Sequence, residues 1–387
     1  MSSYRTSQPH ARTGKRPFES IVKRAIAPLL AGACAFLGLH LTVLPNMASP
    51  AGSEKDDLSF LAPAALKNNP PPAGTDELRR NFQDPPADFR TAPLWVWNDE
   101  MDPARMKDQL RQFKEQGFGG VFIHPRPGLM TEYLGNDWFA LWRVALDECK
   151  TLGLLCNIYD ENSYPSGFSG GHVPSAAPDT AAQYVQVQIV DKAPEGFSPA
   201  TLGVFRVKQD DQSRVVEATR EDSREGAKSE GKFAVFSLRH AGGSPWTGQF
   251  PYVDLTNPET AQQFIATTFE PYKKHFGGEF GKTIKWSFDD EPLLSTGGAY
   301  EQAELSLPIN YNTLAEFQKR NGYDPRDALP SLFWDVGNYQ KVRFDYWQTL
   351  HDLWKENFMR PIFLWCAKRL WARDAFSRKP TWIARTR

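Results

Sequence analysis

The spacing of apolar residues from Pro93 onward alternates between two patterns. Short apolar runs are followed by longer segments in which apolar residues recur every three or four positions, which is the spacing of an amphipathic helix. The runs are PLWVWN (93–98), GGVFIHP (119–125), LLCNIYD (154–160) and KTIKWSFD (282–289), and the helical segments are 102–117, 136–153 and 256–278. Strands that alternate with helices are typical of βαβ units, so the pattern predicts an α/β fold with a parallel sheet.

The pattern changes between the third and fourth runs. Four segments there alternate apolar and polar residues without helical spacing and are separated by polar or glycine-containing turns: 184–191, 201–208, 213–220 and 232–240. This alternation predicts a small antiparallel β region inserted into the α/β fold, over residues 181–243. Two further helical segments follow, at 311–324 and at about 336–369.

Each of the four runs of the parallel set gives way to polar or ionisable side chains at its C-terminal end. The residues at these ends are Trp97 and Asn98, then His124 and Arg126, then Asp160 and Glu161, and finally Asp289, Asp290 and Glu291. In a (β/α)8 barrel the C-terminal strand ends converge on one face, which carries the active site. Polar residues begin wherever loops begin, but several carboxylates with a His and an Arg differ from the Ser, Gly and Lys of ordinary turns. We therefore expect a functional site at these ends.

The three adjacent acids at 289–291 suggest a reaction. Adjacent carboxylates repel one another, and burial raises the pKa of a carboxyl group, so folding alone gives little reason for them. Hydrolysis of a glycosidic bond needs one protonated carboxyl group as acid and one ionised carboxylate as base or nucleophile. We expect Glu291 to be the acid, because its longer side chain reaches further into a cleft, Pro292 fixes the turn behind it, and crowding raises its pKa.

A resemblance makes this expectation more specific. The motifs PLWVWN, GFGGVFIHPRPGL, YLGNDWF, NIYDENSYPSGFSGG and FDDEP resemble bacterial glycoside hydrolases related to the α-L-rhamnosidases of glycoside hydrolase family 106, over about Pro93 to Cys366. The resemblance implies part of a (β/α)8 TIM barrel, about four of its eight strands. It also implies that Glu291 is the catalytic acid, that the mechanism is inverting and that a calcium ion belongs to the sugar site.

The resemblance further implies sugar contacts near Asn98, His124, Arg126, Asp160 and Glu161, and we place Trp97 and Asp290 with them as expected substrate-binding residues. The Glu-Pro ending of a fourth strand is also similar to the acid/base motif of retaining glycosidases. The two mechanisms differ in the separation of the carboxyl groups, about 5–5.5 Å in retaining and 6.5–9.5 Å in inverting enzymes. The sequence does not identify the second carboxylate, so the anomeric outcome stays open.

Composition narrows the choice of partner. The chain has 387 residues, with 45 basic and 46 acidic side chains, so its net charge is near zero and no general attraction to nucleic acid is expected. A neutral oligosaccharide or glycoside fits better, and aromatic residues, 13% of the chain, commonly stack on sugar rings. The four cysteines are too few and too irregularly spaced for a disulfide framework or a zinc cluster.

The N-terminal segment predicts export. Basic residues precede an apolar stretch, Ala25 to Leu44, and small residues follow it, which indicates a signal peptide over 1–51 and a secreted or periplasmic protein. About 20 apolar residues can also span a bilayer, so a retained membrane anchor is the alternative. Residues 52–92 are rich in Pro and Ala and predict a linker. The remaining predicted parts are the barrel segments 93–180 and 244–368.

The end of the sequence differs from the family pattern. Residues 369–387 carry six basic side chains and one acid without strand periodicity, so we expect either a broken reading frame or a basic surface tail. A complete barrel has eight strands, and the base or nucleophile is expected on a later strand than these four. We therefore expect poor solubility and little or no hydrolysis by this chain alone. The alternatives to a glycosidase are a non-catalytic carbohydrate-binding protein and a metal-dependent hydrolase, the latter weakened because the sequence has no HxH or HExxH pair.

Overall fold

The computed structural model describes residues 74–194, 196–221, 230–245, 247–294 and 305–369. The predicted signal peptide, residues 52–73 of the predicted linker and residues 370–387 of the predicted tail lie outside the described residues. No helix among the residues that the structure describes is long and apolar enough to cross a membrane.

The strands form two sheets. The first has four parallel strands in the order β1-β2-β3-β8, and the second has five antiparallel strands in the order β6-β5-β7-β4-β9. In chain order the strands are β1 (Leu94–Trp97), β2 (Gly120–Pro125), β3 (Leu155–Tyr159), β4 (Gln183–Lys192), β5 (Thr201–Gln209), β6 (Val215–Arg220), β7 (Glu230–His240), β8 (Ser287–Phe288) and β9 (Ser306–Pro308). The predicted mixed α/β class and its parallel sheet are confirmed, while closure into a barrel stays a prediction.

The described helices are α2 (Thr75–Gln83), α3 (Pro103–Glu115), α4 (Asn136–Leu152), α5 (His172–Ala176), α6 (Pro258–Phe264), α7 (Glu270–Phe276), α8 (Tyr311–Asn321), α9 (Leu329–Phe333), α10 (Tyr339–Trp354) and α11 (Arg360–Arg369). Helix α3 connects β1 to β2 and α4 connects β2 to β3, while α5, α6 and α7 lie between β3 and β8 in the chain. Helix α3 begins where the Asp102 carboxylate accepts a hydrogen bond from Arg105 N, and α4 ends at Gly153, whose φ of 66° suits glycine. Single π turns, 265–269 and 355–359, join α6 to α7 and α10 to α11.

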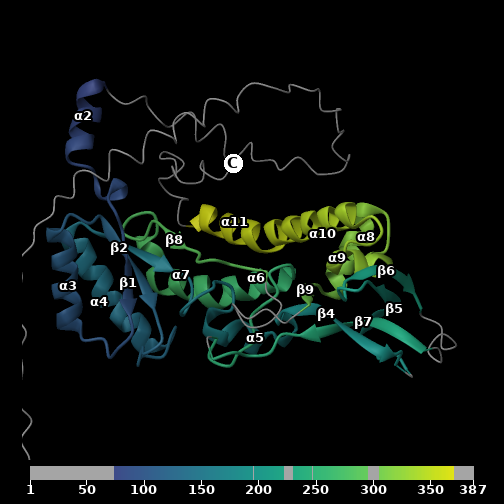
Figure 1. Ribbon diagram of the computed structural model, residues 1–387. Coiled ribbons are helices and arrows are strands. Elements are labelled where there is room, and N and C mark those ends of the chain that lie inside the picture. The colour runs from purple at the N-terminus through teal and green to yellow at the C-terminus, as the bar shows by residue number, and fades with distance from the viewer. Residues whose placement is uncertain (1–73, 195, 222–229, 246, 295–304, 370–387) are drawn as a thin grey trace, which may run out of the picture. The chain divides into compact units, whose positions relative to one another are not determined.

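The parallel sheet buries one face against helices. Helices α3 and α4 lie beside strands β1 and β2 (Figure 1). Trp95 and Trp97 of β1 and Ile123 of β2 are at most 4% exposed and belong to one apolar core with residues of α3 and α4. The opposite face is more open, since Leu94 and Val96 of β1 are 40% and 44% exposed. Side chains alternate across a strand, so this difference fixes which face each strand-end residue joins.

The antiparallel sheet has its own core. Side chains of β4, β5 and β7 pack with α8, α9 and α10 in a second cluster, centred on residues such as Phe236 and Tyr346. Strand β9 pairs with β4 at the sheet edge, and the sequence pattern did not predict this strand. The predicted fourth parallel strand is also shorter than its apolar run, because only Ser287 and Phe288 pair with β3 as a strand.

Candidate active site at the strand ends

Backbone hydrogen bonds join the four C-terminal strand ends to one another. They run from Arg126 N to Trp97 O (3.0 Å), from Ser163 N to Pro125 O (3.0 Å), from Asp160 N to Phe288 O (3.2 Å) and from Ser166 N to Asp290 O (2.8 Å). Each bond crosses from one strand end to its neighbour in the sheet. The loops after β1, β2, β3 and β8 are therefore one connected structure, as the parallel arrangement requires.

A row of side chains crosses the open face of the sheet at these ends. Val96 pairs with His124 between β1 and β2, and Tyr159 pairs with Phe288 between β3 and β8. The rings of His124 and Tyr159 have centroids 3.8 Å apart, and Tyr159 stacks on Phe288 with centroids 5.8 Å apart and planes at 13°. The row places an imidazole, a phenol and an exposed phenyl ring side by side.

Tyr159 is the centre of this row, and the sequence reasoning missed it. Its Oη lies 2.7 Å from Ser163 O and 2.5 Å from Asp290 Oδ2, so it contacts both the loop after β3 and the acids after β8. Burial raises the pKa of Tyr159 above its usual value, and the hydrogen bond with Asp290 raises it further. A signal existed in the sequence, because a Tyr that ends a buried strand needs a partner for its hydroxyl.

The buried Asp160 and the half-buried Asp289 form a carboxyl pair. Burial raises the pKa of Asp289 to about 7, and burial together with Asp289 raises the pKa of Asp160 well above its usual value. Ser166 Oγ lies 2.6 Å from Asp160 Oδ1 and also hydrogen-bonds Asp289. Asp160 Oδ2 and Asp289 Oδ1 are buried and have no hydrogen-bond partner among the described residues. Crowding thus acts on Asp289, an acid of the 289–291 run.

Glu161 is fully buried and holds a loop. Its two carboxylate oxygens accept five backbone N–H bonds of 2.5–3.1 Å, from residues 162, 167, 168, 169 and 170. Burial raises the pKa of Glu161, and the backbone hydrogen bonds act in the opposite direction. Since N–H groups occupy both oxygens, we assign the ionised form. Its observed contacts are with backbone, and the sugar contact expected of it stays a prediction.

His124 is neutral at pH 7. Burial lowers its pKa to about 4, and the positive charge of Arg126 acts in the same direction. Its side chain is 4% exposed, and its Nδ1 has no hydrogen-bond partner among the described residues. The Arg126 guanidinium lies over the ring of Tyr164, 4.9 Å from the ring centroid. The site therefore has one free imidazole nitrogen beside a partly exposed cation.

The remaining predicted residues differ in exposure. Trp97 is fully buried against Trp138 of α4, with ring centroids 5.2 Å apart, so it belongs to the core. Asn98 is exposed, and its carbonyl lies where a Cβ on Gly128 would approach to 2.5 Å, which requires glycine there. Glu291 is exposed and has a φ of 48°, a left-handed conformation that costs about 1–2 kcal/mol for a residue with a Cβ.

The side chains at the strand ends are the candidate ligands of the calcium ion that the family resemblance implies. Among the described residues no group of three or more His, Cys, Asp or Glu side chains is arranged to hold a metal ion. Calcium binds through six to eight oxygens, usually including carboxylates, and here Glu161 is already occupied by N–H groups. The calcium ion therefore stays a prediction, and no step below depends on a metal.

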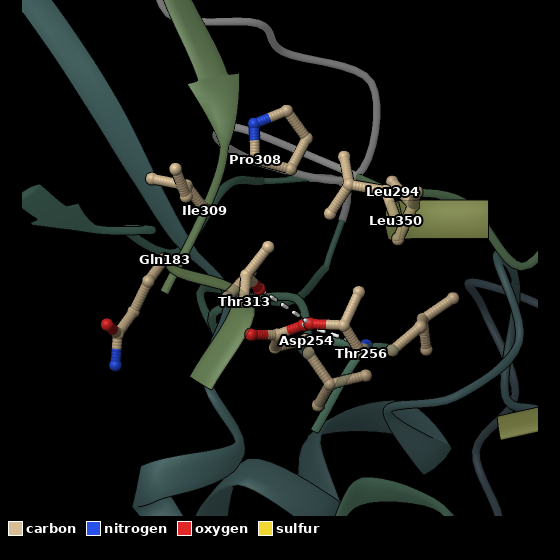
Figure 2. Close-up of a pocket in the computed structure, with 11 residues that line it drawn as sticks. Gln183, Asp254, Thr256, Leu294, Pro308, Ile309, Thr313 and Leu350 are labelled. Carbon is tan, nitrogen blue, oxygen red and sulfur yellow. Dashed lines mark hydrogen bonds between the residues drawn. The ribbon is translucent and has the colours of Figure 1, made fainter. Parts of the chain in front are cut away.

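A small cavity lies outside the strand-end site. It measures about 10 Å³ and is lined by residues that include Asp254, Thr256, Leu294 and Leu350 (Figure 2). The Asp254 carboxylate accepts hydrogen bonds from Thr256 N and Oγ1, at 2.8 and 2.7 Å. A space of this size holds one water molecule at most. It is too small for a sugar, so it is not the substrate site.

The sequence and structure of the chain were compared with known proteins, and the comparisons bear on its fold. No family model matches the chain, and no curated protein sequence matches it. Among solved structures, the chain is similar to the rhamnosidase from Novosphingobium sp. PP1Y, with a TM-score of 0.51 and 12% sequence identity. The match covers 76% of this chain and 46% of that structure, so the chain spans about half the length of the rhamnosidase. At this identity the similarity concerns the fold.

Proposed function

We propose that the strand-end site belongs to a glycoside hydrolase of the α-L-rhamnosidase type. One observation carries the proposal. Backbone hydrogen bonds connect the C-terminal ends of the four parallel strands, and His124, Tyr159 and the acids at 289–291 lie at these ends. The fold similarity to a rhamnosidase supports the same class. The export signal predicted at the N-terminus and a neutral glycoside as substrate belong to this proposal.

Glu291 is the proposed general acid. It is the exposed member of the three adjacent acids, so it can approach a glycosidic oxygen, while Asp289 is held among buried groups. Its left-handed backbone conformation also fits a functional residue, because such strain persists where the surroundings impose it and clusters at active sites. The base or nucleophile of the reaction is not assigned.

The test measures binding and turnover separately. Calorimetry with L-rhamnosides and hydrolysis of a fluorogenic aryl α-L-rhamnoside are compared for the natural chain, Glu291→Gln and the control Glu115→Gln, which changes an exposed acid of α3. We expect sugar binding by all three proteins and slow turnover that falls at least about 100-fold in Glu291→Gln only.

Each alternative result has a meaning. Binding without turnover in a folded sample supports a carbohydrate-binding protein instead. A folded protein that neither binds nor cleaves these sugars contradicts the proposal, and turnover that survives in Glu291→Gln contradicts the role of Glu291.

A further inference from the structure

Glu291 lies between two backbone attachments. On its N-terminal side Asp290 is bound twice by Ser166, because Asp290 O accepts from Ser166 N and Asp290 N donates to Ser166 Oγ, both at 2.8 Å. On its C-terminal side Leu293 N donates to Tyr252 Oη at 3.4 Å. The backbone on both sides of the proposed acid is therefore held by residues that are distant in the chain.

One further hydrogen bond joins the two attachments. Tyr252 Oη donates to Ser166 O at 2.7 Å, so this hydroxyl group contacts both Ser166 and Leu293. Ser166 Oγ is fixed in turn by Asp160, since it donates to Asp160 Oδ1 at 2.6 Å. The side chains of Ser166 and Tyr252 are 0% exposed, so water does not compete for these bonds. The bonds form a continuous path from Asp290 through Ser166 and Tyr252 to Leu293.

The backbone of Glu291 needs support of this kind. Its φ of 48° is unfavourable for a residue with a Cβ, and Pro292 further restricts the conformation of the residue before it. A segment free to relax would return φ to a negative value. Strained conformations persist where the surrounding structure imposes them, and the bonds on both sides of Glu291 can do so.

We propose that Ser166 and Tyr252 are positioning residues that hold Glu291 in its left-handed conformation and thereby fix the place of its carboxyl group. They act through the backbone of Asp290 and Leu293 and not by contact with a sugar. The role of Glu291 as general acid rests on the proposed function. The support of its backbone by Ser166 and Tyr252 does not.

Backbone support matters here because the Glu291 side chain is exposed. Packing fixes the place of an exposed side chain less than that of a buried one, so the backbone has the larger share in directing the carboxyl group. A displacement of a reacting group by about 1 Å can reduce a rate ~100-fold. A loss of either attachment should therefore affect the proposed acid more than it affects sugar binding.

The test is an NMR measurement on the ligand-free protein. A residue with a positive φ has a short distance between its amide and Hα protons, which gives a strong NOE between them. This NOE is measured at Glu291 in the natural chain, in Tyr252→Phe and in Ser166→Ala. We expect a strong NOE in the natural chain and its loss in both variants, because each variant removes hydrogen bonds that flank Glu291.

Two matched controls each remove a buried hydroxyl group elsewhere. Tyr272→Phe removes the acceptor of Trp138 Nε1 at 3.2 Å, and Ser169→Ala removes the partner of Thr268 Oγ1 at 2.8 Å. Both controls should keep the NOE at Glu291 even if their stability falls. An equal loss of the NOE in the controls would show that loosened packing, and not the attachments, is responsible, and would overturn the proposal.

The other outcomes also decide. A weak NOE in the natural chain overturns the proposal, and so does an NOE that is unchanged in both Tyr252→Phe and Ser166→Ala. An NOE that is unchanged in one of them removes that residue from the role. If one variant does not fold, the other variant still tests its own attachment.

Turnover of the fluorogenic aryl α-L-rhamnoside separates positioning from binding. We expect kcat of Tyr252→Phe to fall at least about 10-fold with KM unchanged, while Tyr272→Phe keeps both values. Equal kcat values for the two variants would contradict the positioning role. Because the NMR measurement uses no sugar, its failure leaves the proposed function standing, and a chain that does not cleave the substrate still reports the conformation of Glu291.

Discussion

Burial of individual acids depends on which face of the sheet each one joins. The sequence predicts that one of the three acids at the end of the fourth run is crowded. Identifying that acid requires knowing which residues of the strand face the core. Phe288 lies on the open face in register with Tyr159. Alternation then turns Asp289 toward the buried side and leaves Asp290 within reach of Tyr159. Residue types alone do not show which residues of the run face the core, so the sequence could not identify Asp289 as a crowded acid.

The raised pKa of Asp289 predicts how stability changes with pH. The folded protein holds a proton on this group up to about pH 7, whereas the unfolded chain releases it near pH 4, so unfolding releases a proton between these values. The free energy of unfolding should therefore fall as the pH rises from about 4 to 7. We expect Asp289→Asn to reduce this fall by on the order of 1–3 kcal/mol.

Urea unfolding at pH 4.5, 6 and 7.5 measures this effect, with the exposed Asp191→Asn as the control. The control should keep the pH dependence of the natural protein. A fall that is larger in Asp289→Asn than in the natural protein would contradict the raised pKa of Asp289. No difference between Asp289→Asn and the control would show that Asp289 is not the group responsible.

At the scale of elements, side-chain oxygens accept hydrogen bonds from backbone N–H groups at two places. Sequence periodicity cannot detect these bonds. The run from Lys282 predicts a full strand, but Asn157 Oδ1 accepts the N–H groups of Lys285 and Trp286, at 3.3 and 3.1 Å. The N–H groups of Cys156 and Ile158 still donate to Thr283 O and Trp286 O, at 2.9 and 3.1 Å, but only two residues form the regular strand β8. The loop after β3 depends in the same way on Glu161.

The Glu161 carboxylate should determine the order of its loop. Glu161→Ala removes the acceptor of five backbone N–H groups, three of them buried, and each unsatisfied buried donor costs about 1–3 kcal/mol. We expect a loss of at least about 3 kcal/mol in stability and faster hydrogen exchange at the amides of 167–170. Glu161→Gln, which keeps the shape, should lose less.

Hydrogen exchange followed by mass spectrometry measures this loop, and Glu115→Ala on the exposed face of α3 is the control. Unchanged exchange at 167–170 in a folded Glu161→Ala protein would mean that other contacts hold the loop. A large stability loss in the control would show that the assay does not isolate this residue.

At the scale of the whole described molecule, two apolar cores are joined by a small polar network. The sequence predicted the parallel strands and the antiparallel strands by their different periods. It did not predict β9, whose three residues are too few to show a period. Leu294 packs against both apolar clusters, and the Asn310 side chain at the start of α8 hydrogen-bonds Asp254 near the small cavity.

This network should stabilise the molecule as a unit. Asn310→Ala removes the donor to the buried Asp254 carboxylate and the cap that accepts from Thr313 N at 2.6 Å. The two losses together should cost about 2–4 kcal/mol. Asn312→Ala, at an exposed position of the same helix, is the matched control and should change stability by less than about 0.5 kcal/mol.

Urea unfolding followed by circular dichroism measures both variants. Equal stability of Asn310→Ala and Asn312→Ala would show that the polar network does not hold the two cores together. A second unfolding transition in Asn310→Ala, absent from the control, would show that the cores have separated into independent units.

The central claim is that the four polar strand ends form one sugar-binding site. Backbone amide NMR shifts recorded during titration with L-rhamnose test it most directly, because each residue reports separately. We predict that shifts change at Asn98, Arg126, Asp290 and Glu291 with a common dissociation constant and stay constant at the exposed Phe344 of α10. Saturable changes confined to other elements, with none at these four residues, would contradict the account.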